Sequence, residues 1–405
     1  AGAGRAGAGL LLGTGPFQLL GRLSYSWYLG HWPFLVFGSI ALGGSPTGRQ
    51  RLALVAASLV AATAGHLLVE QPIRYLRVFR HRPWRGLGLG AALTATAVAA
   101  ALLAMQFPPM IARAGGHGLP AVATARSALT ADLAAGAAIR ALPTGLTPAL
   151  GAAATDIPVI FPDGCAIRET IEDHTTAPCE YGDRASATTV VLFGDSHAGN
   201  WFVALNDIAL QRHWRLVMFM KGTCSVAATL IDLGAVKRPF AECVQWRRRS
   251  IERIVAMRPA MVVLASTDYM QFLHDETGDD DQVWTDAWRT SIGQLRAAGA
   301  ATVLISDTPR LQQTAPTCLA AHLTDVRPCS VSRGLALPTE RRRSMIAAAA
   351  VAAGATVIDP LPWFCTTTSC PVIVNDVLVY RDKHHITTAY SRLLGPLLAA
   401  KLPLR

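Results

Sequence analysis

The chain has 405 residues, of which 51% are hydrophobic and only 16% are charged, and its formal net charge is +10. That length is enough for two or three domains. A mean hydropathy of +0.31 is high for a purely soluble protein and favours membrane segments. The positive charge does not require nucleic acid, because much of it lies beside apolar segments, and we expect no nucleic-acid partner. Residue 1 is Ala rather than Met, which is typical of a fragment or a processed piece.

Three stretches near the start of the chain are apolar enough to cross a bilayer, which takes about 20 residues. They are Leu23–Gly44, Leu52–Val69 and Leu87–Ala112. Buried helices of a soluble protein are the alternative, and three such runs so close together disfavour it. The sequence therefore predicts three transmembrane helices.

Arginines orient these spans. Five of them lie in the short loop between the second and third spans, namely Arg74, Arg77, Arg80, Arg82 and Arg85. By the positive-inside rule this loop is cytoplasmic, although Arg49 and Arg51 in the other loop argue mildly against it. The third span then runs outward, and the chain after residue 112 lies outside the cytoplasm.

Residues 113–160 are rich in Ala, Gly, Leu, Pro and Thr and carry little charge. We expect an extracytoplasmic linker here, with a short helix around Ala128–Ala141.

All eight cysteines lie after residue 160. An even number confined to one region indicates disulfides and an oxidising compartment, which agrees with the topology that the arginines predict. We choose the nearest-neighbour pairing, which is Cys165–Cys179, Cys224–Cys243, Cys318–Cys329 and Cys365–Cys370. A zinc site is the alternative, but the sequence lacks paired Cys-x-x-Cys spacing, so we expect no bound metal.

From residue 161 onward, strand-like and helical patterns alternate along the chain. The strand-like runs are Thr189–Phe193, Arg215–Met220, Met261–Ala265, Ala301–Ser306 and Ala355–Ile358. The helical patterns include Arg238–Met257, Gln282–Ala298, Thr339–Ala353 and Ile386–Leu402. Such alternation predicts an α/β domain in which helices cover both faces of a parallel sheet.

The turn at Gly194-Asp195-Ser196 joins the first of these strands to a helical pattern. Ligands bind at this edge of α/β sheets, and N–H groups at a helix N-terminus stabilise negative charge. A Ser at this position is equally typical of a helix cap. A serine nucleophile also needs a base and a group that orients the base. Asp382 and His385, three apart in one late loop, are suited to both roles.

Gly194-Asp195-Ser196 followed by Asp382-x-x-His385 resembles the SGNH (GDSL-like) hydrolase family, and most closely the SGNH domain fused behind acyltransferase-3 membrane proteins. This resemblance implies a three-layer α/β/α domain over residues 161–405. It also implies that Ser196 is the nucleophile, His385 the base and Asp382 its orienting partner. His384 is the competing base, and the family spacing selects His385.

The start of the chain carries a second resemblance. Residues 21–33, with Val69-Glu70-Gln71-Pro72-Ile73-Arg74, resemble the last two spans of an acyltransferase-3 domain. Residues 1–85 are then the C-terminal part of that domain, and residues 86–112 are an additional transmembrane helix. The family's earlier spans, which carry its acyl-transferring residues, are missing, so the missing N-terminal part is an expected partner.

Several further residues are candidates for contact with substrate. The Ser196 N–H is the first expected oxyanion donor, and Gly222 stands where the family offers a second. The family's third donor is an Asn, but this chain has Ser266 and Thr267 there, whose hydroxyls are candidate substitutes. This departure weakens the case for an efficient hydrolase. His197 either touches substrate or is an ordinary helix residue, whereas Asp195 is expected to fix the turn through backbone N–H groups.

These features predict a membrane-anchored O-acyltransferase in a bacterial inner membrane, with its SGNH domain outside the cytoplasm. The resemblance implies O-acetylation, or another short O-acylation, of a cell-envelope polysaccharide or glycolipid through an acyl-serine. The expected partners are an acyl donor and a glycan acceptor, with acyl-CoA as the ultimate donor and no bound cofactor. An esterase with the same triad and a non-catalytic glycan-binding domain are the alternatives.

Overall fold

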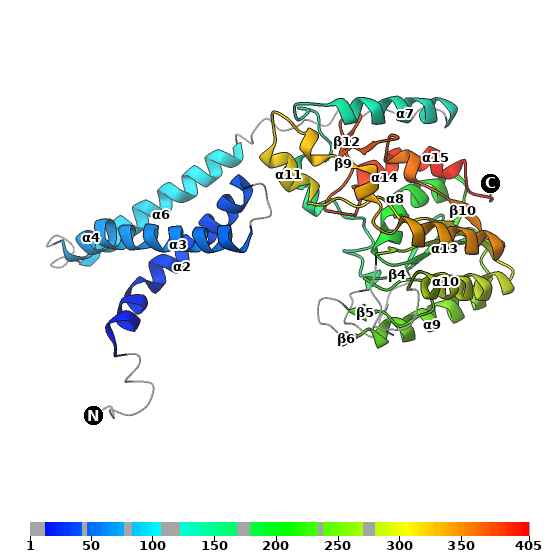
Figure 1. Cartoon of the computed structure of the whole chain (residues 1–405), viewed down its shortest axis with the longest axis horizontal. Coiled ribbons are helices and arrows are strands. Elements are labelled where there is room, and N and C mark those ends of the chain that lie inside the picture. The colour runs from blue at the N-terminus through cyan, green and yellow to red at the C-terminus, as the bar shows by residue number, and fades with distance from the viewer. Residues whose placement is uncertain are drawn as a thin grey trace. The chain divides into compact units, whose positions relative to one another are not determined.

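The structure is a computed structural model, and it describes residues 13–42, 47–76, 83–106, 122–167, 179–233, 238–269 and 280–404. The chain divides into two compact units, Ala1–Met110 and Ile111–Arg405, which are described separately below. Figure 1 shows the helices of the first unit and the mixed helices and strands of the second.

The first unit is helical where it is described. Its helices are α2 (Gly15–Ala41), α3 (Gly48–Gly65), which continues through a π-helical turn into α4 (Gln71–Tyr75), and α6 (Pro83–Gln106). Among the described residues, one helix, Gly48–Ile73, is long and apolar enough to cross a membrane, and it contains the second predicted span. The other two predicted spans overlap α2 and α6 and stay predictions as membrane segments. Residues 77–82 of the arginine-rich loop lie outside the described residues.

A seven-stranded sheet forms the centre of the second unit, in the order β1-β4-β3-β7-β8-β10, with β2 beside β4. Every neighbouring pair is parallel except β2 with β4. The strands are β1 (Ala166–Ile167), β2 (Glu180–Gly182), β3 (Thr189–Gly194), β4 (Arg215–Lys221), β7 (Met261–Ala265), β8 (Ala301–Ile305) and β10 (Thr356–Ile358). The five predicted strands and the parallel sheet are confirmed.

The sheet is buried on both faces, which explains why its strands are apolar without alternation. Along β3, Val190 and Leu192 belong to one hydrophobic core, whereas Val191 and Phe193 belong to the other. The first core lies under α7 (Val122–Ala138), α8 (Ser196–Gln211), α14 (Thr388–Leu393) and α15 (Gly395–Ala399), and the second under α9 (Ala241–Met257), α10 (Asp280–Ala297) and α13 (Glu340–Ala352) (Figure 1). The second unit is therefore the three-layer α/β/α domain that the sequence predicts.

Small elements complete the second unit. The remaining helices are α11 (Ala315–Ala321) and α12 (Arg333–Ala336), and 3-10 turns lie at Leu150–Thr155, Arg327–Cys329 and Leu361–Trp363. Three two-stranded ribbons pair β5 (Asp232–Leu233) with β6 (Arg238–Pro239), β9 (Val331–Ser332) with β11 (Ser369–Cys370), and β12 (Ile373–Val374) with β13 (Val377–Leu378).

The expected linker is only partly separate from the domain. The helix expected around Ala128–Ala141 exists as α7, but its Leu129 and Leu133 are buried in the first core. Gly136 lies so close to the Ile373 carbonyl that a Cβ atom would fall 2.2 Å from the oxygen. The predicted helix is therefore confirmed, but its packing on the domain was not expected; an Ala-rich segment can still bury a stripe of leucines.

The four predicted disulfides are confirmed: the structure pairs Cys165 with Cys179, Cys224 with Cys243, Cys318 with Cys329, and Cys365 with Cys370. One predicted helix differs. The pattern over Ile386–Leu402 is divided between α14 and α15, and Pro396 stands at the start of the second helix. Proline has no N–H to continue the preceding helix, which accounts for the break.

Candidate active site

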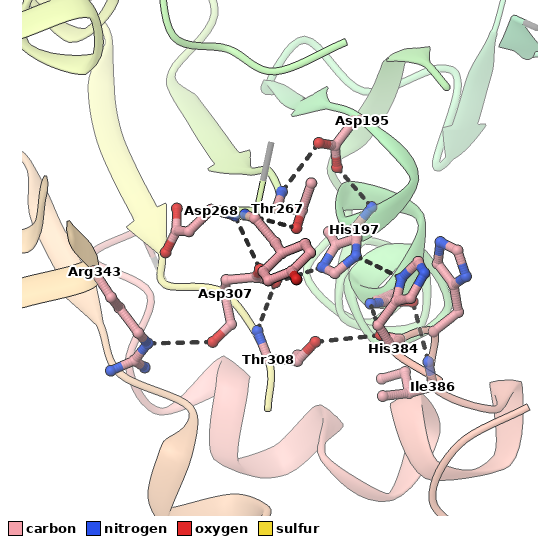
Figure 2. A network of polar contacts seen from close by, with 12 residues as sticks. Asp195, His197, Thr267, Asp268, Asp307, Thr308, Arg343, His384 and Ile386 are labelled. Atoms are coloured by element: carbon pink, nitrogen blue, oxygen red, sulfur yellow. Dashed lines mark hydrogen bonds and ion pairs between the residues drawn. The ribbon is translucent and has the colours of Figure 1, made fainter. Parts of the chain in front are cut away.

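The candidate site begins where β3 ends. A Cβ atom on Gly194 would lie 1.8 Å from the Ala265 carbonyl oxygen, so only glycine fits this close approach of β3 to β7. Asp195 then caps α8: one carboxylate oxygen accepts from the His197 N–H at 2.8 Å, and the other accepts from the Thr267 N–H at 3.0 Å (Figure 2). Asp195 therefore fixes the turn, as expected, and Ser196 is the first residue of the helix.

Burial and hydrogen bonding shift the pKa of the Asp195 carboxyl in opposite directions. Burial raises the pKa of this carboxyl to about 6, although His197 and the two N–H donors lower it. Its carboxylate is nevertheless the acceptor that holds the Ser196 turn against β7. Ser196 itself is partly exposed and lies at the N-terminus of α8.

The Asp382 carboxylate organises the late loop. One of its oxygens accepts from the backbone N–H groups of His384, at 2.9 Å, and His385, at 2.8 Å. The other oxygen lies 2.7 Å from His385 Nδ1. Burial raises the pKa of Asp382, but these partners outweigh it and hold that pKa far below the usual range. Because a carboxylate only accepts, His385 Nδ1 carries the hydrogen and Nε2 keeps its lone pair.

His385 is therefore suited to act as a base. Burial lowers its pKa below the ordinary value, although the bond from Asp382 opposes this, so the ring is neutral at neutral pH. Its Nε2 is buried and has no hydrogen-bond partner among the described residues. The geometry also distinguishes the roles of the two neighbouring histidines, because the Asp382 carboxylate accepts a hydrogen bond from the side chain of His385 and not from that of His384.

Asn200 of α8 ties this loop to the helix that carries Ser196. Its Oδ1 accepts from the Ile386 N–H at 3.2 Å, and its Nδ2 donates to the His384 carbonyl at 3.5 Å. The His197 and His385 rings lie 5.4 Å apart between centroids. The expected hydrogen bond between Ser196 Oγ and His385 Nε2 is not formed in the described part of the chain. In serine enzymes this bond often tightens only in the substrate complex.

A second acid–histidine pair lies beside the first. His197 Nδ1 bonds Asp307, which follows β8, and His197 Nε2 lies 2.9 Å from His384 Nδ1 (Figure 2). Burial lowers the pKa of His197, but the charge and hydrogen bond of Asp307 outweigh it and raise that pKa to about 9. Burial and the neighbouring rings of His197 and His385 lower the pKa of His384 to about 3. Sequence reasoning left open whether His197 touches substrate or is an ordinary helix residue, and it missed the partner Asp307.

Asp307 and Asp268 form a buried acidic pair behind His197. An Asp307 oxygen accepts from the Asp268 N–H at 3.0 Å, and both carboxyl groups are buried (Figure 2). Burial alone would raise the pKa of Asp307, but His197 and two backbone N–H groups lower it below the usual value. Burial and the Asp307 charge raise the pKa of Asp268. The negative charge of the pair therefore resides on Asp307, beside His197.

Two of the expected oxyanion donors, Gly222 and Ser266, take part in other hydrogen bonds. The Gly222 N–H donates to the Ile167 carbonyl at 2.8 Å, because β1 pairs with the end of β4. The Ser266 hydroxyl is buried and accepts from the Val226 N–H at 3.1 Å. The expectation that the Gly222 N–H serves as a free donor was therefore wrong. The Ser266 hydroxyl keeps its own hydrogen while it accepts this bond, so its role as a donor stays a prediction.

Thr267 is partly exposed and remains near the site. Its N–H is used by Asp195, and its hydroxyl accepts from the Tyr269 N–H at 3.3 Å. It borders a small hollow next to the two acid–histidine pairs, which His197, Asp307, Arg310 and His384 also line. The Arg310 guanidinium lies 4.2 Å from the centre of the Tyr269 ring in this hollow.

Comparison with known proteins gives the class and then the family. The layers of the sheet and the position of the two pairs at its edge define an SGNH-type α/β domain. A model of the SGNH domain (fused to AT3 domains) matches residues 164–400, which is more than half of the chain. The chain therefore belongs to the family of SGNH domains fused to AT3 domains. No curated protein matches the sequence.

Several solved structures are similar to about half of this chain. One is the periplasmic domain of a lipopolysaccharide acetyltransferase from Salmonella ser. Paratyphi A, 16% identical, with 52% of this chain and 82% of that chain covered at a TM-score of 0.43. A GDSL-like lipase from Bacteroides thetaiotaomicron is 13% identical, with 53% and 86% covered at a TM-score of 0.33. The acetyl xylan esterase AlAXEase is 12% identical, with 53% and 100% covered at a TM-score of 0.33.

Proposed function

We propose that this protein is an O-acyltransferase that carries an acyl group on Ser196 and transfers it to a hydroxyl of a cell-envelope glycan. The observation that carries the proposal is the state of His385. Its Nδ1 is bound by Asp382, whereas its buried Nε2 is free of any partner among the described residues. Membership of a family of SGNH domains fused to AT3 domains supports an acyl group as the cargo.

The reaction proceeds in two transfers. His385 Nε2 removes the Ser196 proton as Oγ attacks the acyl carbonyl, and the tetrahedral intermediate places its oxyanion near the Ser196 N–H at the start of α8. The intermediate collapses as the leaving group takes the proton from His385, which leaves an acyl-serine. A sugar hydroxyl then gives its proton to His385, attacks the acyl carbon and releases Ser196. Asp382 keeps the proton-accepting nitrogen of His385 in place through both steps.

The proposed membrane location and acyl supply rest on other observations. We place the second unit outside the cytoplasm, and four disulfides are typical of an oxidising compartment. An AT3 membrane part would deliver the acyl group from cytoplasmic acyl-CoA. The helix Gly48–Ile73 is the candidate span for anchoring in a bacterial inner membrane.

Water competes with the sugar for the same acyl-serine, so the experiment must count both products. The 405-residue chain, purified in detergent, is incubated with p-nitrophenyl acetate with and without an envelope oligosaccharide. Acetylated sugar and free acetate are then measured by mass spectrometry. The proposal predicts acetylated sugar with the wild type, none with Ser196→Ala, and wild-type yield with Ser332→Ala, an exposed serine that serves as the control. Free acetate alone would identify an esterase, and neither product would contradict an acyl-serine enzyme.

A further inference from the structure

Three imidazoles converge beside Ser196. One ring nitrogen from each of His197, His384 and His385 lies within 4.8 Å of a nitrogen from both of the others. His384 links the other two: its ring stacks on His197 at 5.1 Å and lies 4.1 Å from His385 between centroids. The proposed reaction uses only His385 of this cluster.

Carboxylates fix the direction in which two of these rings present their lone pairs. His197 gives its Nδ1 to Asp307, and His385 gives its Nδ1 to Asp382, so each ring directs Nε2 away from its carboxylate. His384 presents Nδ1 toward His197 Nε2 at 2.9 Å. A carboxylate on the far nitrogen is the usual outer partner of a metal-bound histidine, because it sets the tautomer and strengthens the donor. The cluster has two such partners.

The buried Nε2 of His385 is an independent sign that this place accepts a ligand. A buried nitrogen lone pair without a partner costs free energy, and this one has none among the described residues. We propose that His197 Nε2, His384 Nδ1 and His385 Nε2 bind a divalent transition-metal ion of the zinc class. Binding of the ion displaces the proton that Asp307 favours on His197. The three imidazole nitrogens then suit such an ion better than Mg²⁺ or Ca²⁺, which prefer oxygen ligands.

The dimensions of the cluster agree with a tetrahedral ion that has three protein ligands. Zn–N distances of about 2.0–2.1 Å place the nitrogens of such a site about 3.3 Å apart. The separation between His197 Nε2 and His384 Nδ1 is 2.9 Å, already shorter than this, and every other separation in the cluster lies within 4.8 Å. The nitrogens therefore need to close by at most about 1.5 Å to bind one ion. The other Cys and His group in the described residues, Cys318 with His322 and Cys329, is no rival, because its sulfurs form a disulfide.

The site has a consequence for activity that rests on the proposed function. An ion on His385 Nε2 takes the lone pair that must accept the Ser196 proton. The ion would therefore inhibit acyl transfer reversibly, and a chelator would restore it. Binding itself does not involve Ser196, which allows the two proposals to fail separately.

Binding is tested on the full chain, purified in detergent without a histidine tag, by titration with Co²⁺ alone and then with Zn²⁺. We expect one equivalent of Co²⁺ to give the intense visible bands of a four-coordinate ion, and Zn²⁺ to remove them. His384→Gln should weaken binding by about tenfold or more. His213→Gln, at an exposed histidine paired with Asp183, should leave binding unchanged. Absent bands, or bands equal in His384→Gln and wild type, would overturn the proposal.

A second measurement needs no variant, so it stands even if His384→Gln fails to fold. Zn²⁺ should protect the peptide that contains His384 and His385 from diethyl pyrocarbonate, while the peptide with His213 reacts equally with and without the ion. Equal reaction of the first peptide in both conditions counts against the site. Ser196→Ala should keep the Co²⁺ spectrum, because Ser196 is not a ligand. If the wild type shows the spectrum but never forms an acyl-serine, the proposed enzyme activity is refuted while the proposed metal site stands.

Discussion

The Asp382→Asn substitution tests the role of the carboxylate at the centre of the site. Asp382 accepts three hydrogen bonds, two from backbone N–H groups and one from His385 Nδ1. An Asn keeps one oxygen for the backbone donors and presents an NH₂ group to His385. The ring must then accept at Nδ1 and carry its hydrogen on Nε2, where it cannot take the Ser196 proton. The fold is retained, but the base is in the wrong tautomer.

The expected loss of rate follows from the loss of the His385 tautomer that carries its hydrogen on Nδ1. The same change in a serine protease lowers kcat about 10⁴-fold, which corresponds to about 5.4 kcal/mol at 1.36 kcal/mol per tenfold. We expect a loss of this order in p-nitrophenol release from p-nitrophenyl acetate, with little change in melting temperature.

The matched control for this prediction is Asp207→Asn, the same chemical change on α8 at a surface pair with Arg392. It should retain wild-type rate, since exposed pairs contribute about 0–1 kcal/mol to stability. If Asp382→Asn is folded and loses less than about tenfold in rate, His385 does not depend on Asp382 for its tautomer and the reasoning is refuted.

Three further predictions concern the stability of the structure around the site. Gly194→Ala places a methyl group 1.8 Å from the Ala265 carbonyl oxygen, so it should lower the free energy of unfolding by about 3 kcal/mol or more, and an unchanged denaturant midpoint would contradict this. Burial raises the pKa of Asp268 in the folded state, so the folded state binds more protons than the unfolded state above about pH 4, and stability falls as the pH rises. Asp268→Asn removes this dependence, and its melting temperature relative to wild type should rise between about pH 5 and about pH 8; a constant difference would count against it. Replacing both Cys224 and Cys243 with Ser should cost about 2–4 kcal/mol of stability, measured by denaturant unfolding, and reductant should then affect the variant less than the wild type.

The layers of the domain could be predicted because they depend on local pattern. The apolar strands that end at Gly194 and Ala265 are buried on both faces, and such strands read as continuous apolar runs. The cysteine pairs could also be predicted, because each closes a short loop. By contrast, α7 carries leucines in an Ala-rich segment with little amphipathic signal, so its docking on the first core was missed.

The site was predicted in part. The spacing of Asp382 and His385 indicates their pairing, because both lie in one turn. The partners that come from elsewhere in the chain were harder to find. Asn200 contacts the late loop across 186 residues, and Asp307 reaches His197 across 110. The only signal for Asp307 was its position after a strand, at the same edge of the sheet. Gly222 was misassigned because its N–H is claimed by β1, a two-residue strand too short to recognise from sequence.

The central claim is that Ser196 carries the acyl group, and peptide mass spectrometry tests it most directly. The full chain is mixed with p-nitrophenyl acetate, stopped with acid within the first turnover and digested. The account predicts an acetyl group on Ser196 in the wild type and its absence in His385→Ala, with the remaining serines unmodified in both. Acetyl on another residue, or an unmodified Ser196 in protein that releases p-nitrophenol, would contradict the account.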